Sequence, residues 1–154
     1  MTGAGDGHSE TAAVQIPLPF PARQRYDRAS FQVSDSNRAA LSLVERWPQW
    51  PGPVCAIFAP EGSGKTHLAH IWAELSSARL YSGGVLTEAE VFALDGVFRI
   101  AIDDADLSAA TEDGARAMFF ALNRAHQEGG YVLLTGQSAP AAWRTGLPDL
   151  RTRL

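Results

Sequence analysis

The stretch that most constrains the fold of this chain is residues 54–66. It begins with an apolar run, Val54-Cys55-Ala56-Ile57-Phe58, and passes through a loop of small residues into Gly64-Lys65-Thr66 and a helical pattern. Strand, glycine-rich loop and helix in this order are typical of a P-loop, whose backbone N–H groups surround phosphate oxygens. The Lys65 ammonium would neutralise phosphate charge and the Thr66 hydroxyl would hold Mg²⁺. We therefore predict a phosphate site here; a glycine-rich turn that binds nothing is the alternative.

One position departs from the usual P-loop pattern. Ala59 stands where the motif has its first Gly, whereas residues 63–66 are intact and Gly62 lies where the loop must bend. This departure bears on nucleotide affinity more than on the fold.

Composition narrows the classes of function. With 154 residues, 45% of them apolar and 19% charged, the chain has room for one domain with a substantial core. A net charge of −4 argues against a broad phosphate-backbone footprint, so bulk nucleic-acid binding is not expected. The single cysteine, Cys55, excludes an internal disulfide, and we expect it to be a small buried residue. The sequence has no candidate membrane span or signal peptide, so we expect a cytoplasmic protein.

Apolar periodicity divides the chain into alternating elements. Amphipathic spacing predicts helices over residues 34–47, 65–77, 87–94 and 111–127. Apolar runs predict strands over residues 54–58, 80–81, 98–102 and 131–135. Strands that alternate with helices indicate an α/β fold, in which helices cover both faces of a parallel sheet.

Two carboxylates follow the strand at residues 98–102. We expect this strand beside the P-loop strand, with Asp103 directed at Mg²⁺ and Asp104 orienting an attacking water. On their own, two acids after a strand are more often a solvated turn or a helix N-cap. The strand at residues 131–135 would lie between these two, and Thr135 or Gln137 at its tip could hydrogen-bond the water or the γ-phosphate. An ordinary strand end is an equal alternative there.

The histidines carry no convergent metal-ligand spacing. His67 and His70 lie three residues apart on the P-loop helix, a spacing that we expect to be incidental. No metal other than Mg²⁺ is therefore predicted.

Each end of the chain allows two interpretations. Residues 1–13 are small and polar, which predicts a disordered tail. Residues 14–24 display large apolar side chains among prolines, so this stretch either packs on the domain or is a peptide ligand for another protein. Residues 147–154 carry two arginines, which form either a solvated helix face or an arginine supplied in trans to a neighbour's γ-phosphate.

Together these motifs resemble the AAA+ module of the DnaA-related proteins over about residues 15–154. Residues 26–37 resemble the first segment of that module, which lies near adenine. The Walker A, Walker B and sensor 1 motifs of the family are matched by residues 64–68, 102–104 and 134–137. Residues 150–154 are similar to its box VII, which places Arg153 at the arginine finger.

The resemblance implies a P-loop NTPase of the AAA+ type, a three-layer sandwich that binds ADP or ATP with Mg²⁺. The implied nucleotide-binding residues are Pro60, Glu61, Gly62, Ser63, Gly64, Lys65, Thr66 and His67. Thr66 and Asp103 are the implied contacts to Mg²⁺, and the implied catalytic residues are Asp103, Asp104, Thr135 and Arg153.

Residues 15–20 resemble the peptide with which Hda, a short member of the family, binds the DNA polymerase III sliding clamp (the beta subunit). This implies that Gln15, Leu18 and Phe20 contact the clamp, and it favours the ligand interpretation of residues 14–24. We expect residues 25–154 to form an incomplete AAA+ domain, because its helical lid, with the sensor 2 arginine, would follow Leu154.

The function implied is regulation of replication initiation. The chain would bind nucleotide, reach DNA only through the clamp, dock on ATP-bound DnaA and promote hydrolysis of that ATP through Arg153. It would then be found at the nucleoid or replisome, with no membrane partner, and homodimerisation is left open. Two rivals remain: a DnaA-like or helicase-loader ATPase that hydrolyses its own ATP, and a scaffold that uses nucleotide to hold its shape.

Overall fold

A computed structural model describes residues 25–154. The tail predicted for residues 1–13 and the clamp-binding peptide predicted for residues 14–24 lie outside the described residues. In chain order the elements are α1 (Arg38–Glu45), β1 (Val54–Phe58), α2 (Lys65–Ser76), β2 (Arg79–Ser82), α3 (Glu88–Phe92), β3 (Arg99–Asp103), α4 (Ala105–Ala109), α5 (Glu112–Glu128), β4 (Tyr131–Gly136), the 3-10 turn η1 (Pro140–Ala142) and α6 (Pro148–Arg151).

The four strands form one parallel sheet in the order β1-β4-β3-β2. β4 pairs with β1 on one side and with β3 on the other. The expectation that the strand ending in Asp103 lies directly beside the P-loop strand is therefore wrong. After β1 the chain crosses to the far edge of the sheet and forms β2 there, then returns inward through β3, and α5 leads it to β4 in the gap beside β1. The expectation that the strand at residues 131–135 separates the two is confirmed.

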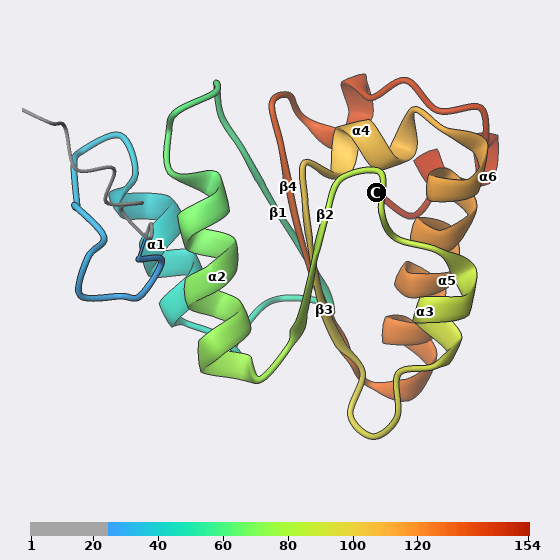
Figure 1. The fold of residues 1–154 in the computed structure, drawn as a ribbon, viewed down its shortest axis with the longest axis horizontal. Coiled ribbons are helices and arrows are strands. Elements are labelled where there is room, and N and C mark those ends of the chain that lie inside the picture. Colours follow the sequence, from blue (N-terminus) through green and yellow to red (C-terminus); the bar gives the residue numbers. More distant parts are fainter. Residues whose placement is uncertain (1–24) are drawn as a thin grey trace, which may run out of the picture.

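Helices cover both faces of this sheet, which confirms the three-layer α/β fold. α1 and α2 lie on one face, and α3 and α5 lie on the other (Figure 1). Each face encloses a separate apolar core, one centred on Trp72 and Leu68 and the other on Met118 and Ile100. Because both faces are buried, the central strands are apolar without alternation.

Cys55 faces the first of these cores. Its side chain is buried, and burial raises the pKa of the thiol to about 11. The interpretation of Cys55 as a small core residue is confirmed.

The predicted elements form, with ends shifted by local turn chemistry. The helix predicted from residue 34 begins at Arg38, because the Asn37 side chain accepts a hydrogen bond from the Ser34 N–H at 2.8 Å and holds a turn before it. The helix predicted from residue 87 has a complete capping box between Thr87 and Glu90. Helix α4 was not predicted, because five residues are too few to show a helical period.

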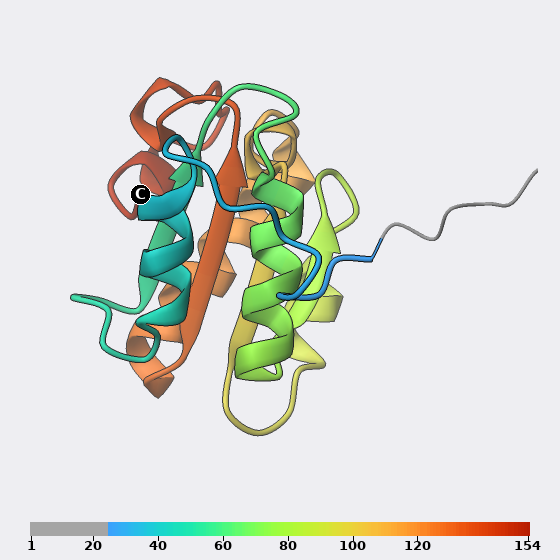
Figure 2. The same ribbon diagram turned by 90° about the vertical axis from the view of Figure 1, so that its left-hand side faces the viewer.

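Parallel strands end at a common edge of the sheet, and this edge carries the polar motifs. The loop after β1, the acids at the end of β3 and the polar tip of β4 come together at the top of the view in Figure 1. The chain before α1 runs across α2, as Figure 2 shows. We call residues 25–31 the arm.

Candidate functional site

The loop between β1 and α2 has the backbone of a phosphate cradle. Gly62 and Gly64 have φ angles of 76° and 91°, in the left-handed region that glycine adopts without steric cost. Gly64 also precedes the twelve-residue helix α2, whose first-turn N–H groups have no partner within the helix. Backbone N–H groups and the positive helix end thus lie together, which suits an anion.

Ala59 does not disturb this cradle. Among the described residues, the non-glycine positions with positive φ are Ser77 and Asp104, so Ala59 has a backbone that any residue adopts. Its N–H donates to the Gly136 carbonyl at 3.2 Å and continues the β1–β4 ladder. The replacement of the first motif glycine is therefore compatible with the loop.

Two polar side chains of the loop are buried in a manner that fits a phosphate group. Lys65 is only 7% exposed, and its Nζ donates to the Pro60 carbonyl at 2.9 Å. The Ser63 hydroxyl is buried without a hydrogen-bond partner. Leaving a buried hydroxyl unpaired costs about 1–3 kcal/mol. An anionic oxygen at the loop would pair with both groups.

Asp103 is the centre of a hydroxyl network that links three elements. Thr66 Oγ1 at the start of α2 donates to one Asp103 oxygen at 2.7 Å, and Thr135 Oγ1 of β4 donates to the other. Thr135 Oγ1 in turn accepts the Asp104 N–H at 3.0 Å. Asp103 and Thr135 are almost fully buried, at 5% and 0% exposure. The hydroxyl and carboxylate predicted to contact Mg²⁺ are thus adjacent, and oxygen donors are the ligands that Mg²⁺ prefers.

Asp104 differs from Asp103 in its backbone and its environment. It has a left-handed backbone with φ of 50°, which Asp tolerates better than most residues. Desolvation raises the pKa of its carboxyl, and the neighbouring charges of Asp103 and Asp106 raise it further. Its side chain lines the cleft described below.

The tip of β4 is held by a residue that the sequence analysis missed. The Gln137 N–H donates to Asp106 Oδ2 at 3.3 Å, and Asp106 Oδ1 is buried without a partner. The Trp143 ring lies below the tip, so close that a Cβ on Gly136 would meet it at 2.8 Å. The signal for Asp106 was its position three residues after Asp103, on the first turn of a helix too short to recognise.

The arm closes the side of the site next to α2. Tyr26 stacks on His70 with ring centroids 4.3 Å apart and an angle of 5° between the rings. His67 contacts both Tyr26 and Phe31 in T-shaped arrangements. The spacing of His67 and His70, expected to be incidental, places both rings on one face of α2, where they contact the arm.

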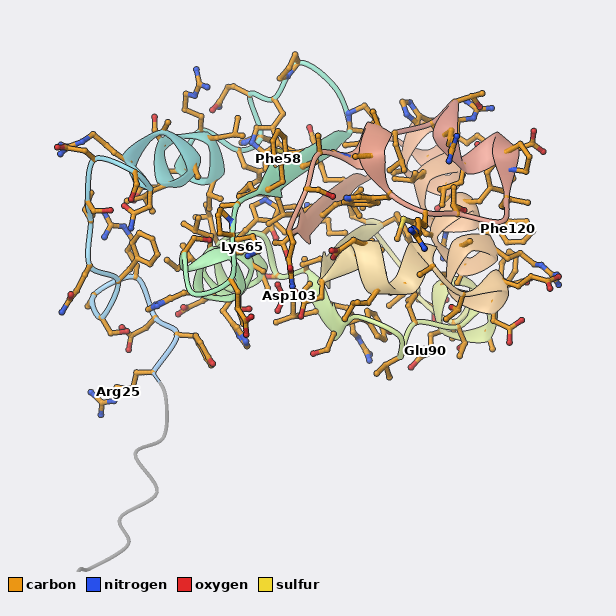
Figure 3. All side chains as sticks on the ribbon, turned by 90° about the horizontal axis from the view of Figure 1, so that it is seen from above. Arg25, Phe58, Lys65, Glu90, Asp103 and Phe120 are labelled. Atoms are coloured by element: carbon orange, nitrogen blue, oxygen red, sulfur yellow. The ribbon has the colours of Figure 1, made fainter. Side chains whose placement is uncertain are left out.

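These parts enclose a cleft of about 390 Å³. Its lining residues are Tyr26, Glu61, Gly62, Gly64, Lys65, Thr66, His67, Asp104 and Gln137. Figure 3 looks onto this edge of the sheet, with Lys65 and Asp103 near its centre. A larger cavity of about 500 Å³ lies between the arm, α1 and α2, but its lining includes none of the P-loop residues. The P-loop residues and Asp104 line the smaller cleft.

The predicted arginine finger lies at the end of the described chain. Arg153 is exposed, and its side chain makes no hydrogen bond or ion pair with any of residues 25–154. It follows α6, which is anchored by the fully buried Leu150. Its role in catalysis stays a prediction.

The described residues contain neither a dense cluster of metal-ligating side chains nor a membrane-spanning helix. No group of three or more His, Cys, Asp or Glu there is arranged to hold a metal ion, so a cation at Asp103 would need oxygens from other sources. None of the described helices is long and apolar enough to span a bilayer.

Solved structures share this fold. DnaA from Aquifex aeolicus, bound to AMPPCP, matches with a TM-score of 0.64 and 18% identity, over 83% of this chain and 47% of that one. Domain III of DnaA from Thermotoga maritima matches with a TM-score of 0.64 and 19% identity, over 87% of this chain and 65% of that one. The chain has the fold of a P-loop AAA+ domain.

A third structure is similar over nearly its whole length. A Neisseria meningitidis protein solved in solution has a TM-score of 0.50 and 23% identity, with 96% of this chain and 93% of that chain covered. By contrast, the chain spans about half the length of the Aquifex DnaA chain, at 47%. No family model matches the sequence.

Proposed function

We propose that this protein binds an adenine nucleotide with Mg²⁺ and regulates replication initiation by promoting hydrolysis of DnaA-bound ATP. The observation that carries the proposal is the junction of Lys65, Thr66 and Asp103 at the glycine loop. The fold shared with a DnaA solved with AMPPCP supports an adenine nucleotide as the ligand.

The residues of this chain have distinct tasks in the proposed site. A nucleotide bound in this cleft would supply the phosphate oxygens and the phosphoanhydride bond. Lys65 exchanges the Pro60 carbonyl for a phosphate oxygen, and the buried Ser63 hydroxyl gains its partner. Thr66 and Asp103 offer oxygens for Mg²⁺, while Thr135 fixes the orientation of the Asp103 carboxylate through its other oxygen.

Action on a second protein is assigned to Arg153. An exposed arginine on a segment anchored by Leu150 is able to reach a neighbouring molecule. There it would stabilise charge that develops on the transferred phosphoryl group. Gln15, Leu18 and Phe20 would tether the protein to the sliding clamp and, through it, to DNA; this assignment rests on the sequence resemblance to Hda.

The test measures hydrolysis of DnaA-bound ATP in the presence of clamp loaded on DNA. Stimulation by the wild type should fall about 10³-fold with Arg153→Ala, the lower end of the range for arginine fingers. Arg151→Ala is the matched control, because Arg151 is exposed on the same segment, and it should leave stimulation unchanged. Gln15→Ala should remove the part of the stimulation that requires the clamp. Full stimulation by both Arg153→Ala and Gln15→Ala would refute the regulatory role.

A second candidate function, hydrolysis of its own ATP, is favoured by Asp104. A carboxyl whose pKa is raised by burial, at the wall of the cleft, is suited to orient or deprotonate water. ATP turnover by the isolated protein that disappears with Asp104→Asn would establish this function. Turnover that survives the substitution would exclude Asp104 from it.

A further inference from the structure

His67 holds the arm to the first turn of the P-loop helix through one directed hydrogen bond. Its Nε2 lies 2.7 Å from the Asp27 carbonyl oxygen. A carbonyl oxygen only accepts, so Nε2 carries the proton and donates it. The Ser30 hydroxyl lies 3.5 Å from the same nitrogen. The His67 ring is therefore directed at the arm.

Two aromatic side chains of the arm contact the same ring. The ring centroids of Tyr26 and Phe31 lie 5.5 and 5.0 Å from that of His67, at angles of 89° and 87°. Edge-to-face pairs at such distances contribute stabilising free energy beyond that expected from the apolar area that they bury. The arm is thus clamped around one side chain of α2.

The arm also touches the phosphate cradle itself. Phe31 is 7% exposed, and its Cε2 would lie 3.2 Å from a Cβ placed on Gly64. Gly64 is the left-handed residue that opens α2, and His67 is in the first turn of that helix. The arm therefore contacts the start of α2, the same part of the chain that completes the phosphate cradle.

We infer that His67 is a positioning residue: it fixes the arm so that Tyr26 forms the wall of the cleft on the nucleoside side. The inference rests on the proposed nucleotide binding and deepens it. Tyr26 and His67 line the cleft together with the phosphate-binding Lys65. A ligand whose phosphates occupy the loop meets the arm with its remaining, nucleoside part. Loss of the His67 bond then weakens nucleoside contacts and leaves phosphate contacts in place.

The experiment compares two ligands, ADP and inorganic pyrophosphate, by calorimetric titration of the full chain with Mg²⁺ present. His67→Phe keeps a ring between Tyr26 and Phe31 and removes the donor, so ADP affinity should fall about tenfold, as expected for one lost hydrogen bond of about 1.4 kcal/mol. Pyrophosphate affinity should stay within about twofold. His67→Gln retains an N–H donor and should restore most of the ADP affinity. His126→Ala, at an exposed position near the end of α5, is the control and should change neither.

Two outcomes would overturn the inference while nucleotide binding stands. Unchanged ADP affinity in His67→Phe would mean that the bond to Asp27 does not matter to the ligand. Equal losses for ADP and pyrophosphate would mean that His67 contacts phosphate directly. If a His67 variant does not fold, Tyr26→Ala takes its place and should show the same ADP-selective loss, whose absence would overturn the inference. Binding of neither ligand by the wild type would remove the proposed function as well.

Discussion

The two ends of the cleft are built in different ways. At the end that we propose for phosphate (the phosphate end), Asp103, Thr135 and Lys65 are buried and joined to neighbouring strands or backbone by hydrogen bonds. At the arm end, the shorter hydrogen bonds of Ser30 lie within the arm, and the arm is tied to α2 at His67 Nε2, which bonds the Asp27 carbonyl and lies 3.5 Å from the Ser30 hydroxyl.

This difference makes the phosphate end rigid and the arm end adaptable. The phosphate end is set by the sheet, because the strands that carry its residues cannot move separately. The arm depends on a few contacts made across about forty residues of sequence, and segments with few buried contacts open at low cost in free energy. We therefore expect substitutions at the phosphate end to affect every phosphate ligand, and those at the arm to affect nucleosides alone.

The largest expected effect is that of Lys65→Ala. Removal of the buried ammonium deletes a charge-assisted hydrogen bond worth about 3 kcal/mol, so affinity should fall about 100-fold for ADP and for pyrophosphate alike. Titration of both ligands measures it, and Arg38→Ala, an exposed position on α1, is the control. Pyrophosphate binding that survived in Lys65→Ala would break the proposed division between the two ends.

Thr135→Val should have the next largest effect, on stability. The substitution keeps the shape of a fully buried side chain but leaves an Asp103 oxygen and the Asp104 N–H without their partner. We expect the free energy of unfolding to fall by about 2 kcal/mol, measured by urea denaturation. Thr135→Ser retains the hydroxyl and should lose less.

A matched substitution at the arm tests the same difference between the two ends. Ser30→Ala also deletes a hydroxyl, one that donates toward the Arg25 and Asp27 carbonyls and lies 3.5 Å from His67 Nε2, but at an exposed position. It should cost no more than about 0.5 kcal/mol. Equal costs for Thr135→Val and Ser30→Ala would show that the two ends are equally fixed.

The difference between the two ends also explains which parts of the site could be predicted from the sequence. The P-loop and the Asp103 strand are contiguous motifs whose chemistry is local, so their residues were identified directly. Strand order was only partly accessible, because periodicity reports which residues are apolar and says nothing of which strands are neighbours. The junction of Thr66 with Asp103 follows once the strands are known to be parallel.

The contacts of the arm could not be predicted in the same way. The bond from His67 to the Asp27 carbonyl joins residues that are 40 positions apart and involves a backbone oxygen, which leaves no mark in the sequence. Asp106 was hidden for a different reason: α4 is too short to show a helical face. Its link to Gln137 depends on the placement of β4 beside β3.

The smallest expected effect concerns Asp104 and changes with pH. Because desolvation and the charges of Asp103 and Asp106 raise the pKa of Asp104 above 3.8, the folded protein binds this proton more tightly than the unfolded chain does. Stability contributed by Asp104 is therefore present below pH 3.8 and is lost as the pH rises through the folded-state pKa. Asp104→Asn, which keeps a residue tolerant of the left-handed backbone, should be more stable than the wild type at pH 7 and lose that advantage near pH 3.5.

Urea denaturation of both proteins from pH 3.5 to pH 7 measures this difference. Solvent still reaches Asp104, so the gain should be smaller than the loss in Thr135→Val. Asp95→Asn, at an exposed loop position, is the control and should show no such trend. A wild type that gains stability relative to Asp104→Asn as the pH rises would mean that the ionised carboxylate is stabilised by the phosphate end. Asp104 would then belong to the hydrogen-bonded network of Asp103 and Thr135 instead of to the desolvated wall of the cleft.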